Sequence, residues 1–105
     1  MKYVMFQLKT EGKPTLFCPV IFPDVMTHKA VAEGVEHVKV TPDGPFAGWW
    51  VWPKAVSAGF IRDGICCGYS ESLNLVAHPD DTFILKSFGG PMPGGIGFAE
   101  RQEFA

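Results

Sequence analysis

The residues best equipped for chemistry lie together in Ser70-Glu71-Ser72, with His78 shortly after them. A hydroxyl, a carboxylate and an imidazole are the ingredients of acyl or phosphoryl transfer, in which a base activates a hydroxyl nucleophile. Neither serine lies in a Gly-x-Ser-x-Gly elbow, however, and serines that follow a strand usually form turns and caps through their hydroxyls. The sequence therefore favours a turn at this segment and a non-enzymatic protein.

Histidine and cysteine side chains are the other candidates for chemistry, as metal ligands. The histidines at positions 28, 37 and 78 lack the short paired spacings that zinc sites use. Neighbouring residues of a strand point to opposite faces, so the sulfurs of Cys66 and Cys67 cannot easily bind one ion together. As small apolar side chains they suit a packed hairpin. We expect no metal and no cofactor.

All three tryptophans fall within Gly48-Trp49-Trp50-Val51-Trp52-Pro53. If this segment is extended, Trp50 and Trp52 point to one face and Trp49 to the other. A small domain can cover one such face, and the second then meets a partner, a second copy or a ligand, since large exposed aromatic area usually marks a contact site. Burial of two rings in the core, with the third covered by the tail or a loop, stays open as the alternative.

Two functions of different class follow from this aromatic segment. In the first, a non-enzymatic protein binds another protein or a second copy of itself through Trp49, Trp50 and Trp52. In the second, a small-ligand module or small enzyme stacks these rings on a planar group such as a nucleobase, and Lys54 or Arg62 meets the charge of the ligand. We favour the first, with homodimerisation as its simplest form.

The composition indicates one small domain with a thinly charged surface. Charged residues make up 19% of the 105 residues, below the roughly 25% of an ordinary soluble domain. The 9 basic and 11 acidic residues give a net charge of -2, and no run of Lys or Arg could follow a phosphate backbone, so we expect no duplex nucleic acid partner. Apolar runs fall far short of the roughly 20 residues of a membrane span. Because the N-terminal residues show no signal-peptide pattern, we expect reduced thiols and a cytoplasmic location.

The elements that position these residues are typical of an α+β domain with a mainly antiparallel sheet. We expect about five strands and two short helices in the order β-β-α-β-β-β-α. The first strand should be half-buried, with Val4, Phe6 and Leu8 on its apolar face. Thr27 caps the first helix, which Gly34 ends. The expected strands cover 2–9, 15–22, 35–41, 56–62 and 65–70.

The clearest local signal is Asp63-Gly64, a dipeptide favoured in two-residue hairpin turns. The loop length predicts that Arg62 opposes Ile65, Phe60 opposes Cys67, Ala58 opposes Tyr69, Ile61 opposes Cys66 and Gly59 opposes Gly68. Facing glycines weaken a sheet, so they indicate that a helix or another backbone approaches closely there.

The last regular element expected is a helix that Pro79 opens and that runs to about Phe88, with two carboxylates at the positive end of its dipole. Residues 1–88 then form a single domain, and 89–105 a flexible Gly/Pro-rich tail. Gly94-Gly95-Ile96-Gly97 in this tail lacks the Gly-Lys-Ser/Thr ending of a phosphate loop.

Five turn and packing patterns follow one another along this chain. They are the strand end Phe22-Pro23, the helix start Thr27-His28, the strand Val56-Ser57-Ala58-Gly59-Phe60, the segment Ser70-Glu71-Ser72-Leu73 and the helix start Pro79-x-Asp81. In these patterns the chain resembles small uncharacterised proteins carried by bacteriophages and prophages. The resemblance implies no reaction and no site residue. It implies a phage accessory protein that acts inside a bacterial cell. For the protein-binding function we consider a host or host-defence protein as the partner.

Overall fold

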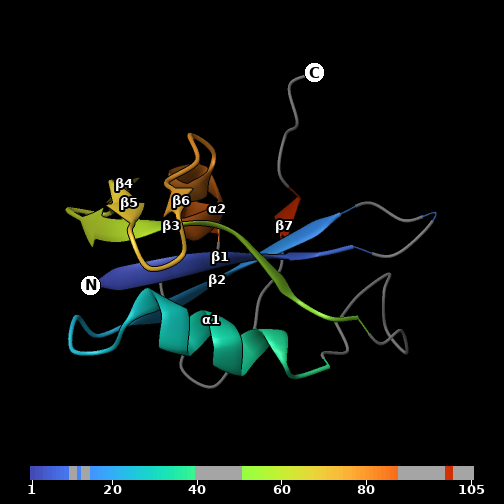
Figure 1. Cartoon of the computed structure of the whole chain (residues 1–105). Coiled ribbons are helices and arrows are strands. Elements are labelled where there is room, and N and C mark those ends of the chain that lie inside the picture. The colour runs from blue at the N-terminus through green and yellow to red at the C-terminus, as the bar shows by residue number, and fades with distance from the viewer. Residues whose placement is uncertain (10–11, 13–14, 40–50, 88–98, 101–105) are drawn as a thin grey trace.

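The fold is a five-stranded antiparallel sheet in the order β4-β3-β1-β2-β7, joined to a small two-stranded sheet of β5 and β6 (Figure 1). The computed structural model describes residues 1–9, 12, 15–39, 51–87 and 99–100. Its strands are β1 (Lys2–Leu8), β2 (Leu16–Phe22), β3 (Lys54–Arg62), β4 (Ile65–Cys67), β5 (Tyr69–Ser70), β6 (Leu75–Val76) and β7 (Ala99–Glu100), and its helices are α1 (His28–Glu36) and α2 (Asp81–Ser87). The expected α+β class with a mainly antiparallel sheet and two helices is confirmed.

The central strand β1 is buried on both faces. Val4 and Phe6 point to one face, Tyr3 and Met5 to the other, and none of the four is more than 1% exposed. The prediction of a half-buried strand was therefore wrong. The sheet has a helix on each side, α1 against one face and α2 against the other (Figure 1).

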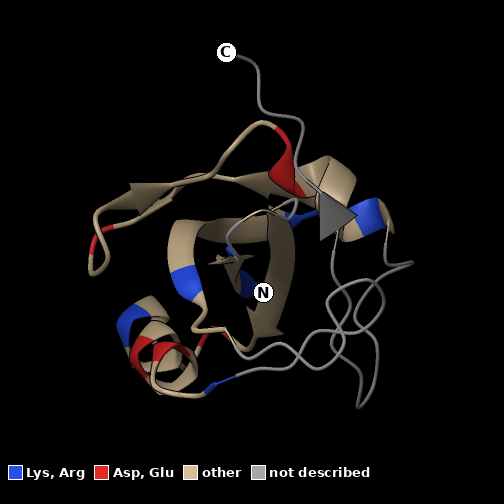
Figure 2. Cartoon of the chain, turned by 90° about the vertical axis from the view of Figure 1, so that its right-hand side faces the viewer, with Lys and Arg blue, Asp and Glu red and all other residues tan. Residues whose placement is uncertain are grey.

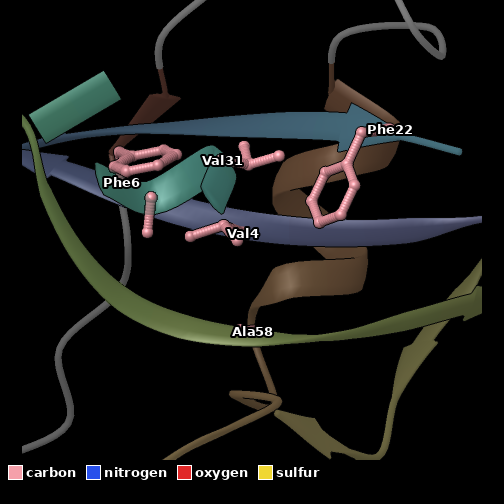
Figure 3. Close-up of a cluster of buried hydrophobic side chains, with 6 residues drawn as sticks. Val4, Phe6, Phe22, Val31 and Ala58 are labelled. Carbon is pink, nitrogen blue, oxygen red and sulfur yellow. The ribbon is translucent and has the colours of Figure 1, made fainter. Parts of the chain in front are cut away.

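On the first face, Val31 and Ala32 of α1 pack against side chains of β1, β2 and β3 (Figure 3). These partners are Val4, Phe6, Phe22 and Ala58. Thr27 caps the helix as expected, because its hydroxyl oxygen accepts a hydrogen bond from the Ala30 amide at 3.1 Å. The exposed side of α1 carries both signs of charge, including Lys29 and Glu33 at 4.0 Å (Figure 2).

The helix α1 continues through Gly34, where the sequence predicted its end. Val35 lies four residues after Val31, so both side chains fall on the face that packs on the sheet. Gly34 lies on the outer side with no other atom near the position of a Cβ, so nothing there stops the helix. The strand predicted over 35–41 is therefore wrong at its start, and residues 40–41 lie outside the described residues.

On the second face, α2 places Ile84 against Tyr3, Met5 and Phe17. The helix begins at Asp81 rather than at the predicted Pro79. The fully buried Asp81 carboxylate accepts hydrogen bonds from the Tyr3 hydroxyl at 2.7 Å and from the His78 amide at 3.0 Å. Burial and then this hydrogen bond raise the pKa of the Tyr3 phenol far above its ordinary value. The pair fastens α2 to the middle of the sheet.

The hairpin of β3 and β4 has the predicted register for its first three pairs, from Arg62 and Ile65 to Phe60 and Cys67. Gly68 then adopts a φ of 80° and ends β4, so Tyr69 pairs with Val76 of β6 rather than with Ala58 as predicted. On the outer side of β4, the Cys66 amide donates to the Thr82 hydroxyl of α2 at 2.9 Å.

The expected close approach at Gly59 is confirmed. A Cβ at this position would collide with the backbone carbonyl of Cys67, and the ring of His28 from α1 reaches the Gly59 carbonyl oxygen on the other side. The backbone of β4 and the first residue of α1 therefore both contact Gly59, which has no side chain.

Only a small part of the expected tail falls within the described residues. Ala99–Glu100 forms β7, which pairs with Leu16 and Phe17 at the end of β2. The remainder of 89–105 lies outside the described residues. Among the residues described, no helix is both long and apolar enough for a membrane crossing.

Replacing Gly59 by alanine should lower the free energy of unfolding by about 1–3 kcal/mol, because the new methyl group must displace the Cys67 carbonyl. The matched change Gly34→Ala should instead stabilise the protein by up to about 1 kcal/mol, since the site is open and alanine favours a helix. Urea denaturation of both variants measures the two changes in free energy of unfolding, which should have opposite signs. Equal effects at the two sites would contradict the close contact at Gly59.

Replacing Tyr3 by phenylalanine should lower the free energy of unfolding by about 1–3 kcal/mol at neutral pH, because the buried Asp81 carboxylate loses a donor. The control Tyr69→Phe removes a hydroxyl from a ring that is 56% exposed and should change little. Since the fold raises the pKa of Tyr3, its contribution is complete below about pH 10 and declines above it as the unfolded phenol ionises. In urea titrations at alkaline pH, the difference in free energy of unfolding between wild type and Tyr3→Phe should therefore become smaller. An increase of this difference with pH would refute the account.

Candidate functional site

A cleft of about 560 Å³ opens at the end of the sheet where α1 begins. Its lining comes from Lys2 of β1, Phe60 and Arg62 of β3, the cap residue Thr27 and the first residue His28 of α1, and the segment 67–72. Binding sites for small molecules in proteins have volumes of about 300–1,000 Å³. The cleft is therefore the candidate site.

The floor of the cleft is the sheet face that α1 covers further along. Lys2 of β1 pairs directly with Phe60 of β3, and Phe60 pairs with Cys67 of β4. Paired residues of an antiparallel sheet share a face, so these three side chains lie in a row across three strands. The Phe60 ring is half-buried and forms the middle of this row.

His28 forms part of the wall between the cleft and the core. It is 5% exposed, and its ring meets the rings of Phe22 and Phe60 edge-on at 5.5 and 5.6 Å. Its Nε2 lies 2.8 Å from the Gly59 carbonyl oxygen, and because a carbonyl can only accept, Nε2 carries a hydrogen. In the neutral ring, Nδ1 is then a hydrogen-bond acceptor, and it has no partner among the described residues.

Two cationic side chains flank Phe60. The Lys2 ammonium donates to the Met26 carbonyl oxygen at 3.0 Å, which holds it at the rim near α1. The Arg62 guanidinium lies over the Phe60 ring at 5.9 Å. Within the described part of the chain, neither side chain forms an ion pair with a carboxylate. Glu71 is the one acidic residue among the described residues that line the cleft.

The opposite wall is a turn shaped by Gly68 and Ser70. The buried Ser70 hydroxyl accepts from the Leu73 amide at 3.3 Å and lies 3.3 Å from the Ser72 hydroxyl. This is the turn-forming role that the sequence favoured for these serines. Gly68 has room for a side chain only at the expense of the Phe60 ring, whose nearest atom would be 3.2 Å from a Cβ.

The catalytic combination considered from the sequence is separated in the fold. Ser70, Glu71 and Ser72 line the cleft, but His78 does not. His78 lies at the start of α2, where its Nδ1 accepts from the Asp80 amide at 3.0 Å. The imidazole that accompanies the serines at the cleft is His28, which sequence reasoning placed in a helix start without a functional role. The one signal in the sequence was the Thr27 cap, which fixes the start of α1 and so the position of His28 beside it.

Among the described residues, the predicted binding residues Trp52, Lys54 and Arg62 do not lie together. Arg62 lines the cleft, whereas Lys54 lies at the other end of β3, roughly 26 Å away along nine strand residues. Trp52 lies beyond Lys54 and is 56% exposed, with the Lys39 ammonium 5.3 Å from its ring centre. Trp49 and Trp50 lie outside the described residues.

Trp52 and its neighbour Val51 behave as the alternation of an extended segment predicts. Val51 is 7% exposed and packs with Leu8, Leu16 and Cys18 at the far end of the sheet. Trp52 points the other way, into solvent. The described part of the tryptophan segment thus presents one ring on the surface.

The three thiols are free and differ in their surroundings. Burial raises the pKa of Cys18 to about 11, and burial also raises the pKa of Cys66 beside Tyr3 and Asp81. Cys67 alone of the three lines the cleft. Within the described residues, no three His, Cys, Asp or Glu side chains gather into a possible metal site.

Comparison of the chain with protein-family models, with curated proteins and with solved structures gives no match.

Proposed function

We propose that this protein binds a small organic molecule in the cleft beside the start of α1. The observation that supports this most is a cavity of about 560 Å³ in which an aromatic floor is bordered by two cationic side chains, Lys2 and Arg62, that form no ion pair with a described carboxylate. Sites for small molecules combine these two features, since apolar area supplies affinity and a few polar groups fix orientation. The proposal keeps the small-ligand function considered from the sequence but moves it away from the tryptophans.

The side chains at the cleft include exposed rings that a ligand could cover and charges that a ligand could neutralise. Tyr69 is 56% exposed, and Phe60 is half-buried although it lies on the core face of the sheet. Covering such rings is favourable because it removes apolar area from water. Lys2 and Arg62 supply charge that no described carboxylate neutralises.

Self-association or protein binding through the tryptophan segment is the second candidate function. It is supported by Trp52, whose indole is 56% exposed at the opposite end of β3 from the cleft. Exposed tryptophans are enriched among the residues that dominate protein interfaces. Because the two surfaces are far apart, one protein could use both.

We further propose that the protein acts in the cytoplasm of a bacterial cell. Its role there would be that of a phage accessory protein that acts on a host or host-defence protein. The three free thiols suit a reducing compartment. A small ligand produced by the host and captured in the cleft would be compatible with that role.

A fragment library added to the ¹⁵N-labelled protein should shift backbone amide signals of residues 60, 62 and 67–72 together, because these line one cleft. The indole N–H signal of Trp52 serves as an internal control, since it lies beyond the far end of β3. Shifts that scatter over the surface, or that gather at Trp52 alone, would contradict a ligand site at the cleft. So would the absence of any shift.

Replacing Trp52 by alanine should reduce the molar mass measured by light scattering if the protein self-associates through this ring, while the melting temperature stays within a few degrees. The fold should tolerate the change because the indole is 56% exposed. Phe83→Ala is the matched control, as Phe83 is 66% exposed on α2. A monomeric wild type, or equal masses for both variants, would exclude self-association through Trp52.

A further inference from the structure

We infer that the ligand of the cleft is a flat-ringed organic molecule with a single anionic group, of the chemistry shared by nucleoside monophosphates and aromatic carboxylates. The inference rests on the proposed function and adds to it the class of ligand. It assigns the ring to Phe60 and Tyr69, and the anionic group to Lys2 and Arg62.

The sign of the ligand follows from the charges at the cleft. Lys2 and Arg62 contribute two positive charges and Glu71 one negative charge, so the lining is positive in a chain whose net charge is -2. Neither cation is paired with a carboxylate within the described residues. A positive site on an otherwise acidic protein attracts an anion in preference to a cation.

The two cations are close enough to act on one anionic group. Lys2 is the direct cross-strand partner of Phe60, and Arg62 lies two residues beyond Phe60 on the same face of β3. Each of them thus has its Cα about 5–7 Å from that of Phe60. Lys2 and Arg62 themselves are diagonal neighbours about 7–8 Å apart, a distance that long side chains can span. Arginine binds phosphate and carboxylate through paired N–H donors, and lysine adds a compact charge. The anionic group is therefore expected at the edge of the Phe60 ring.

The size and the aromatic lining require more than an inorganic anion. A volume of about 560 Å³ lies within the range of sites for small organic molecules and is far more than a phosphate ion fills. The rings of Phe60 and Tyr69 offer apolar area to the remainder of the ligand, and flat rings stack on such side chains. A planar ring attached to the anionic group uses both parts of the cleft.

Glu71 limits the total negative charge of the ligand and favours hydrogen-bond donors on its ring. Its carboxylate would repel a polyphosphate, whereas it can accept from an amino group. His28, which also lines the cleft, has a second ring nitrogen, Nδ1, without a partner among the described residues. A ring with exocyclic N–H groups and one anionic substituent fits this set of groups.

Four probes separate the parts of this inference in NMR titrations of the cleft amides. Adenosine 5′-monophosphate carries ring and phosphate, adenosine the ring alone, ribose 5-phosphate the anion alone, and indole-3-acetate a ring with a carboxylate. We expect at least one of the two ring-bearing anions to bind about tenfold more tightly than adenosine and ribose 5-phosphate. The stronger of the two identifies phosphate or carboxylate as the preferred group.

Matched variants test the assigned residues with the ring-bearing anion that binds more tightly. Arg62→Gln should weaken it about tenfold, whereas Lys54→Gln, the same loss of charge at the far end of β3, should have little effect. Tyr69→Ala should weaken it and Tyr69→Phe should not, because the ring rather than the hydroxyl is assigned to stacking. Thermal melting checks that each variant is folded.

The outcomes distinguish this inference from the proposed function. If neutral fragments shift the cleft amides but adenosine binds as tightly as both ring-bearing anions, the ligand class is wrong and the binding site stands. Equal effects of Arg62→Gln and Lys54→Gln would likewise overturn the assignment of the anionic group. If neither fragments nor any of the four probes shift the cleft amides, both proposals fail.

Discussion

A central strand with apolar side chains on both faces must be covered from both sides, and the rest of this structure depends on that constraint. Val4 and Phe6 require α1, whereas Tyr3 and Met5 require α2. Tyr3 also brings a hydroxyl into the interior, which is costly unless it is hydrogen-bonded. The Asp81 carboxylate meets it at 2.7 Å, so the covering of the second face is specific in position as well as apolar.

The cleft lies where the covering of the first face stops. α1 begins at His28, and the floor residues Lys2, Phe60 and Cys67 continue past that point toward the end of the sheet. His28 closes the core at this boundary, since its ring packs between Phe22 and Phe60 and its N–H satisfies the Gly59 carbonyl. The floor of the site is thus the end of the core, and the turn at 68–72 forms its opposite wall.

Local signals in the sequence predicted local structure well. Asp63-Gly64 fixed the turn and three pairs of the hairpin, and Thr27 marked the helix start. The failures involve contacts between distant segments. The alternation of the first strand predicted one buried face, but the partner that covers Tyr3 on the other face, Asp81, is 78 residues away. Gly34 suggested a helix end although Val35 still packs on the sheet. At the cleft, Arg62 belongs to the predicted binding set, which placed it beside the tryptophans, whereas Lys2 and His28 join it through tertiary packing that no spacing in the chain reveals.

The outer edge of the sheet at β4 has a consequence for how copies of this protein could meet. The strand has three residues, Gly68 turns the chain away after them, and the outward Cys66 amide is occupied by the Thr82 hydroxyl. An exposed strand normally offers a template of unpaired backbone groups on which foreign strands can grow into aggregates. Here that template is short and partly blocked, so the hairpin can border an open cleft without inviting fibril-like stacking along this side.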